Sequence, residues 1–126
     1  DRTPNHLSFG QRKRVAIAGA VAMRPQVLLL DEATAGLDPK AVHDLLDTLT
    51  ALSRAGTAVV LATHDVDVAW TWSQDTLILS EHTVRRGPTH ELLCDDALLA
   101  DARLATPWGA AVSRRLNRTV LRPSDI

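Results

Sequence analysis

The sequence predicts an α/β fold in which parallel strands form a sheet with helices flanking it. The segments 27–30 and 57–62 are short, apolar runs, and each is followed by a stretch with helical spacing of its apolar residues. Alternation of this kind is typical of parallel sheets. Ligands of such sheets bind at the carboxyl ends of the strands, which is where Asp31-Glu32 and His64 are expected.

Bulk properties restrict the class of protein. The 126 residues are enough for one domain with its own core, and 45% hydrophobic content excludes a disordered or fibrous chain. A net charge of -1 argues against a surface that binds nucleic acid. Cys94 is the single cysteine, which fits a reducing compartment. The sequence shows neither an apolar run long enough to span a bilayer nor a signal peptide at its polar start, Asp1-Arg2-Thr3-Pro4-Asn5.

The first predicted helix covers about residues 9–23. Ser8 followed three residues later by Gln11 is the capping-box pattern that begins a helix. Arg24-Pro25 ends it, because the residue before a proline is disfavoured in the helical conformation. The run 27–30 then predicts a strand that is buried on both faces, since the apolar residues are continuous.

The middle of the chain predicts a loop over residues 31–37 and a second helix from Asp38-Pro39 to Gly56. Asp suits the N-cap, Pro suits the first helical position, and Gly suits the left-handed residue after the helix. The apolar face of this helix repeats at helical spacing: Val42, Leu45, Leu46, Leu49 and Leu52. Residues 57–62 predict a second buried strand, and Asp65 is expected to cap a short helix that runs to about Trp72.

The last third of the chain predicts a hairpin and two short helices. A third strand over 76–80 pairs with a fourth over 83–86. Thr89 is expected to cap one helix, and residues 95–104 to form another. Beyond Pro107 no helical pattern is recognised, and the arginines there are interpreted as a solvated basic tail: Arg114, Arg115 and Arg118.

The carboxylates Asp31-Glu32 are the first candidate site. A carboxylate pair at the end of an apolar strand repels itself unless a cation or water lies in front of it. Asp31 would hold Mg²⁺ through water, and Glu32 would activate an attacking water as general base. The alternative is that Asp31 only caps the following turn, and the pair alone does not decide between the two.

Two further positions have both a functional and a structural interpretation. A lone His64 after a strand is more often structural, but beside the acids it suits a donor to a terminal phosphate. Ser8 to Gln11 is a plain capping box, yet a helix start also offers N–H groups and partial positive charge to a phosphate. Ser8 adds a hydroxyl, and Gly10 allows a close approach to the backbone.

Taken together, these segments resemble the motif series of ABC transporter nucleotide-binding domains. The series runs through Leu7-Ser8-Phe9-Gly10-Gln11, then 14–18, then Leu30-Asp31-Glu32 within 28–39, then Thr63-His64-Asp65. The resemblance covers about residues 7–87. It implies a P-loop NTPase core of RecA-like type, with a parallel sheet and flanking helices. Within the family, the segments 14–20, 34–39 and 87–93 are similar to energy-coupling-factor importers of the cobalt and nickel type.

The resemblance implies a role for each matching residue. Ser8, Gly10 and Gln11 belong to the signature that contacts the terminal phosphate of an ATP bound to the opposite subunit. Asp31 matches the Mg²⁺ acid, Glu32 the catalytic base and His64 the switch histidine. Asp38 matches the acid that crosses the dimer interface. ATP and Mg²⁺ are the implied cofactors.

The chain also departs from the family pattern. Phe9 stands where the commonest signature has Gly, and Ala33 where Pro is usual. More seriously, the phosphate-binding loop G-x-x-x-x-G-K-[ST] is absent from the sequence. We therefore expect an incomplete nucleotide-binding domain, lacking the amino-terminal half that carries this loop. The expected parts are the end of a signature subdomain (1–24), the C-terminal part of the ATPase core (25–94), and a C-terminal helix and tail (95–126).

The implied function is that of an ATP-hydrolysing subunit that powers an importer for cobalt, nickel or another small solute. Its implied partners are a second ATPase subunit, head to tail, and integral membrane subunits, with no nucleic acid, at the cytoplasmic face of the membrane. The chain alone is expected to be inactive, and either to fold poorly or to pair with an N-terminal piece. The alternatives are a non-catalytic remnant that only completes a partner's ATP site, and an ABC ATPase of the DNA-repair or translation type. The last is disfavoured, because the sequence has neither long heptads nor a basic surface.

Overall fold

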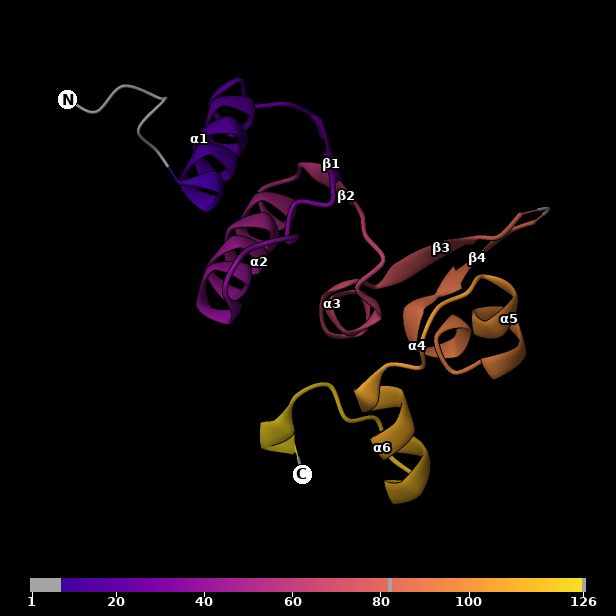
Figure 1. Cartoon of the computed structure of the whole chain (residues 1–126). Helices are drawn as coiled ribbons and strands as arrows, with labels where there is room; N and C mark the ends of the chain where they lie inside the picture. Colours follow the sequence, from indigo (N-terminus) through magenta and orange to yellow (C-terminus); the bar gives the residue numbers. More distant parts are fainter. Residues whose placement is uncertain (1–7, 82, 126) are drawn as a thin grey trace. The chain divides into compact units, whose positions relative to one another are not determined.

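The computed structural model describes residues 8–81 and 83–125, and the chain divides into two compact units between Thr63 and His64 (Figure 1). The first unit holds α1 (Phe9–Ala22), β1 (Val27–Asp31), α2 (Pro39–Arg54) and β2 (Ala58–Ala62). The second holds α3 (Val66–Trp72), β3 (Asp75–Leu79), β4 (Val84–Pro88), α4 (Thr89–Leu92), α5 (Asp96–Asp101), α6 (Trp108–Leu116) and a 3₁₀ turn (Pro123–Asp125). The predicted subdivision into 1–24, 25–94 and 95–126 stays a prediction.

Helix α1 begins as the sequence predicts. The Ser8 side chain accepts a hydrogen bond from the backbone N–H of Gln11, and the Gln11 side chain accepts one from the backbone N–H of Ser8. Both arms of the capping box are therefore present, which satisfies two N–H groups that the first helical turn leaves open.

Strands β1 and β2 are parallel, in a register that runs from Val27 opposite Ala58 to Asp31 opposite Ala62. Helix α2 packs against β2, and Leu28 on β1 is only 5% exposed. The expectation that the strand is buried on both faces is wrong in this unit, because Leu29 is 72% exposed and Val60 is 52% exposed. Alternate residues of a strand point to opposite faces, and α2 covers one face of the pair.

Helix α2 has the predicted ends. Asp38 is the N-cap, Pro39 occupies the first helical position, and Gly56 follows the C-cap with φ of +99°. Its buried residues are Ala41, Leu45 and Leu49, which belong to one face at helical spacing. The predicted amphipathic helix is confirmed.

The second unit is built around the antiparallel hairpin of β3 and β4, in which Thr76 lies opposite Gly87. One face of the hairpin exposes Leu77, Leu79 and Val84, whereas Ile78 on the other face is buried. The core behind that face is formed by Trp70, Ile78, Leu93, Leu99 and Ala110. The hairpin is confirmed, with boundaries that differ by one or two residues.

Thr89 is not the helix cap that the sequence suggests. Helix α4 begins with Thr89 itself, and the N-cap, Pro88, offers no side-chain hydrogen bond. The Thr89 side chain is buried, and its hydroxyl lies 2.9 Å from Ser73 Oγ and 2.8 Å from Thr76 Oγ1. Tertiary partners have therefore replaced the local cap. The helix expected over 95–104 is also shorter, with Asp95 as its cap.

Helix α6 was not predicted, because its buried residues, Gly109 and Ala110, are too small to mark an apolar stripe. Arg114 is exposed, as the interpretation of a solvated basic tail expects, but it lies in a helix and has side-chain partners. Its guanidinium donates to Asp96 at 2.7 Å and to the Cys94 carbonyl at 2.7 Å. This pairing lowers the pKa of the Asp96 carboxyl, to which Thr106 also donates, and raises the pKa of Arg114.

Candidate functional site

Asp31 and Glu32 lie at the carboxyl end of the parallel strand pair, as predicted. Asp31 is the last residue of β1 and is exposed. Glu32 follows with φ of +46°, and its N–H donates to the carbonyl of Ala62 at the end of β2, at 2.9 Å. A left-handed conformation costs a residue with a side chain about 1–3 kcal/mol, and such residues are found where surrounding contacts enforce them.

The loop after Glu32 is compact. The Glu32 carbonyl accepts from the N–H of Ala35 at 3.2 Å, and the Thr34 carbonyl accepts from the N–H of Leu37 at 3.2 Å. Gly36 has φ of +72°, which glycine adopts without steric cost. Ala33 and Thr34 are buried, so the loop is anchored in the unit although Asp31 remains exposed.

Lys13 is a site residue to which sequence reasoning assigned no role. Its ammonium donates to the Glu32 carbonyl at 2.6 Å and to the Ala35 carbonyl at 2.9 Å. Lys13 therefore joins α1 to both ends of the tight turn that contains Glu32. The available signal was its rarity, since the chain has 12 arginines but only two lysines among its 14 basic residues.

The start of α1 also touches this loop. A methyl group on Gly10 would meet Leu37 Cδ2 at 3.2 Å, so the backbone and the leucine side chain are already close. Ser8 is exposed at the same helix start. The unit thus places the helix start that carries Ser8, Gly10 and Gln11 beside the loop that follows the carboxylates, with the contact made at Gly10.

Asp38 and His64 lie at the ends of connecting segments. Asp38 is exposed, and its carboxylate accepts from the Ala41 N–H at 2.9 Å, so it caps α2. His64 is the exposed first residue of the second unit, and the next residue, Asp65, caps α3 by accepting from Val68 N–H at 3.0 Å. The predicted roles of both residues in an ATP site stay predictions.

The donor chemistry at Asp31 fits a hydrated Mg²⁺, since this ion is commonly held by one or two carboxylates, water and substrate phosphates. Over residues 8–81 and 83–125, no three His, Cys, Asp or Glu side chains cluster in a way that would hold a metal by themselves.

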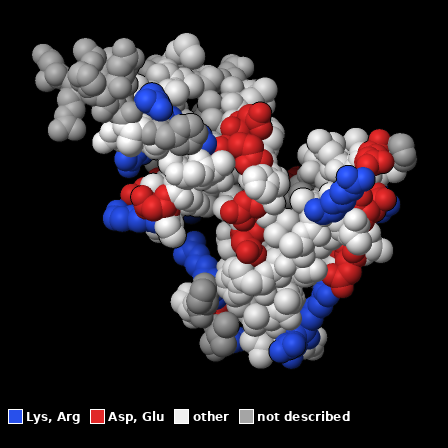
Figure 2. Space-filling model, viewed as in Figure 1, with Lys and Arg blue, Asp and Glu red and all other residues white. Residues whose placement is uncertain are grey.

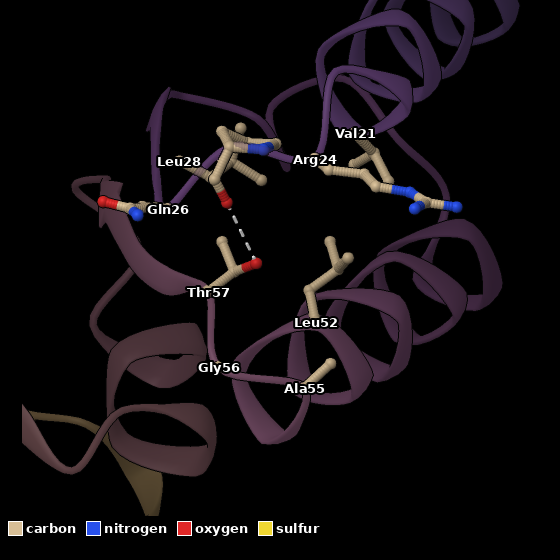
Figure 3. A pocket seen from close by; sticks show the side chains of 9 residues that line it. Val21, Arg24, Gln26, Leu28, Leu52, Ala55, Gly56 and Thr57 are labelled. Atoms are coloured by element: carbon tan, nitrogen blue, oxygen red, sulfur yellow. Dashed lines mark hydrogen bonds between the residues drawn. The ribbon is translucent and has the colours of Figure 1, made fainter.

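A cavity of about 520 Å³ lies in the first unit (Figure 3). Pro25, Leu28, Leu52 and Thr57 are among its lining residues, and the Thr57 hydroxyl donates to the Pro25 carbonyl at 3.2 Å. These residues surround the amino ends of β1 and β2, whereas Glu32 follows the carboxyl end. The cavity is therefore not part of the candidate site.

The surface in view carries both signs of charge (Figure 2). Figure 2 shows basic side chains dispersed among acidic ones, without one broad basic area. Within the described part of the chain, no helix combines the length and the apolar character needed to cross a membrane.

Comparisons with known proteins bear on the first unit and on the whole chain. Residues 1–68 match a family model described as "AAA domain, putative AbiEii toxin, Type IV TA system". The chain is 58% identical over 111 residues to a "Putative ABC transporter ATP-binding protein" from Streptomyces coelicolor, covering 87% of this chain and 39% of that protein. It is 44% identical over 117 residues to an energy-coupling factor transporter ATP-binding protein from Methanospirillum hungatei, covering 91% of this chain and 29% of the relative.

Solved structures of ABC transporter proteins are also similar to this chain. The fold is similar to the structure described as "An inward-facing conformation of a putative metal-chelate type ABC transporter", with a TM-score of 0.73 and 30% identity over 82% of this chain and 41% of that one. It is also similar to cbiO1 from Clostridium perfringens, part of the ABC transporter complex cbiONQ, with a TM-score of 0.65 and 34% identity over 90% of this chain and 46% of that one. The predicted α/β fold class is confirmed, and the chain spans less than half the length of these proteins.

Proposed function

Because the chain belongs to the AAA-domain family and forms part of an ABC transporter ATP-binding domain, we propose that the complete protein is the ATP-hydrolysing subunit of an ABC importer. The observation that carries the proposal is the position of Glu32. It follows the carboxyl end of a parallel strand pair, in a turn held against the start of α1 by Lys13. We further propose the energy-coupling-factor type, with a metal ion such as cobalt or nickel, or another small solute, as cargo.

Each candidate residue has a role in the proposed reaction. Glu32 accepts the proton of a water molecule as it attacks the terminal phosphate, which is general base catalysis. His64 donates to that phosphate. Asp31 holds the hydrated Mg²⁺, which would neutralise phosphate charge when bound.

Ser8, Gly10 and Gln11 act on the nucleotide of a second subunit. An exposed helix start with partial positive charge suits the terminal phosphate of ATP. Asp38 lies at the end of the same loop and would cross to the partner subunit. The proposed assembly is a head-to-tail dimer attached to integral membrane subunits at the cytoplasmic face of the membrane, without nucleic acid.

Two observations support the finer assignment to this type of importer. Relatives with 44% and 36% identity are energy-coupling factor transporter ATP-binding proteins, and one structural neighbour is described as a "putative metal-chelate type ABC transporter". The competing proposal is a non-catalytic remnant that lends Ser8 and Gly10 to a partner's ATP.

Glu32→Gln in the complete protein tests the proposal. The amide cannot accept the proton, so we expect ATP turnover to fall by about 10²- to 10⁴-fold while ATP is still bound. Steady-state phosphate release and nucleotide binding measure the two effects. Glu91→Gln, the same change at an exposed residue of α4, is the matched control and should leave turnover unchanged.

Turnover that is unaffected by Glu32→Gln would remove Glu32 from the role of base. A complete wild-type protein that binds a partner subunit but hydrolyses no ATP would favour the non-catalytic alternative.

A further inference from the structure

We infer that Lys13 is a positioning residue that couples the start of α1 to the backbone of Glu32, so that phosphate at the helix start and alignment of the base are linked. The inference rests on the proposed function, which assigns the phosphate site to the start of α1 and the role of base to Glu32. Its physical basis is the pair of hydrogen bonds from the Lys13 ammonium to the Glu32 and Ala35 carbonyls, at 2.6 Å and 2.9 Å.

First, the Lys13 side chain spans the distance between α1 and the turn that contains Glu32. Lys13 is five residues beyond the cap Ser8, which is about 7.5 Å along a helix axis. Its ammonium binds the carbonyls of Glu32 and Ala35, the first and last residues of one turn of the loop. A single side chain thus connects a helix that starts at the proposed phosphate site to the residue proposed as base.

The second step is conformational. Glu32 is held at φ of +46°, a conformation that its Cβ disfavours. The Glu32 carbonyl accepts from Ala35 N–H and from the lysine ammonium, and a hydrogen bond from a charged donor is about twice as strong as a neutral one. Removal of the ammonium weakens the restraint, so the turn can relax and redirect the Glu32 side chain.

The third step is that α1 touches the loop at a second point. Gly10 lies against the side chain of Leu37, near the far end of the loop from Glu32. With contacts at both ends of the loop, a displacement of α1 carries the loop with it. Phosphate bound at Ser8 and Gly10 therefore biases the geometry of this chain's own Glu32, which belongs to a different nucleotide site.

Misplacement of a catalytic group by about 1 Å can reduce a rate about 100-fold, so loss of this restraint should be visible in turnover. We expect Lys13→Met, which keeps the length of the side chain and removes the ammonium, to lower kcat of the complete protein by about tenfold or more, with KM for ATP unchanged. Lys13→Arg keeps a charged donor and should recover most of the activity. Lys40→Met is the matched control, because Lys40 is exposed on α2 and pairs with Asp44.

Hydrogen exchange at the amides of residues 32–37 gives a readout apart from activity. In the wild type, a non-hydrolysable ATP analogue with Mg²⁺ should increase protection of these amides in the dimer. In Lys13→Met, exchange should be faster without nucleotide, and the increase in protection should be lost. Lys13→Gln, a milder change with an amide donor, is measured in parallel in case Lys13→Met fails to fold.

The inference is overturned if a folded Lys13→Met or Lys13→Gln protein shows wild-type kcat and wild-type protection at residues 32–37. A rise in KM without a change in kcat also contradicts it, because it indicates a role in ATP binding instead. Failure of the proposed function gives a different result, because Glu32→Gln would then leave turnover intact. Hydrogen exchange in the Lys13 variants would still show whether Lys13 restrains residues 32–37.

Discussion

At the scale of single residues, the second unit depends on a position that must lack a side chain. Trp70 is 1% exposed, and its indole N–H donates to the Val120 carbonyl at 2.9 Å. Gly109 lies directly against that indole, so that a methyl group there would be 2.6 Å from Trp70 Cδ1 and 2.9 Å from the Val120 carbonyl oxygen. Both neighbours are buried and cannot move aside without breaking this hydrogen bond.

Gly109→Ala should therefore destabilise the protein by about 1–3 kcal/mol, the usual cost of overpacking. The free energy of unfolding from denaturant titration measures this effect. Gly19→Ala on α1 is the control, because nothing lies within 4 Å of the added methyl group. It should be neutral or stabilise by up to about 1 kcal/mol, since alanine favours helix. Equal stabilities of the two variants would show that Trp70 can be displaced without cost.

The position of a functional residue could be predicted where it depends on neighbours in the sequence. The position of Glu32 at a strand end followed from the apolar run before it. Its left-handed φ and its connection to Lys13 did not, because the backbone of Glu32 is bonded to residues distant in sequence, Ala62 through its N–H and Lys13 through its carbonyl. The same holds for Gly109, whose requirement for glycine arises from the side chain of Trp70.

At the scale of elements, helix boundaries with a local cap were predicted and those with a tertiary cap were not. Ser8, Asp38 and Asp65 each accept from an N–H within three residues, so the local sequence contains the whole interaction. Helix α6 is different, because its Trp108 N–H donates to the Asp67 carboxylate of α3 at 2.9 Å, 41 residues away. Pairing of Arg114 with Asp96 then joins α6 to α5.

The pairing of Asp96 with Arg114 predicts a dependence of stability on pH. The pKa of the Asp96 carboxyl is lower in the folded protein, chiefly because of the Arg114 hydrogen bonds and then that of Thr106. The ionised Asp96 contributes fully to the free energy of unfolding above the ordinary pKa of aspartate, about 3.9. This contribution is lost as the pH falls through the lower pKa that Asp96 has in the folded protein. Thermal melting should show Asp96→Asn less stable than the wild type at pH 7, with the difference vanishing in acid.

Asp101→Asn, a change to an exposed aspartate in the same helix, provides the comparison for this pH series. A difference between wild type and Asp96→Asn that persists unchanged at the acid end would contradict the assignment, because a protonated Asp96 can no longer form the ion pair.

At the scale of the whole molecule, the residues that the structure describes form two compact units, each with its own two-stranded sheet. Each sheet leaves a face with exposed apolar residues, Leu29 and Val60 in the first unit and Leu77, Leu79 and Val84 in the second. Strands β2 and β3 are paired only with β1 and β4 among the described residues. Exposed strands of this kind favour self-association.

The 126-residue chain by itself should show no micromolar binding of Mg-ATP in calorimetry. The glycine-rich loop and lysine that supply most phosphate contacts in this family are absent from its sequence. The complete protein, which contains that loop under the proposed function, is the positive control. Tight one-to-one binding by the chain alone would show that the contacts from α1 and the carboxylates are sufficient.

The sequence by itself determined the α/β class, the ends of the locally capped helices and the position of the carboxylates at the end of a strand. Those features depend on periodicity and on contacts between residues a few positions apart. The tertiary structure decided the left-handed Glu32, the lysine that holds it, the buried hydroxyl cluster at Thr89 and the helix α6. Each of these is stabilised by a partner distant in sequence, and the free energy of such a contact is available only once the chain has folded.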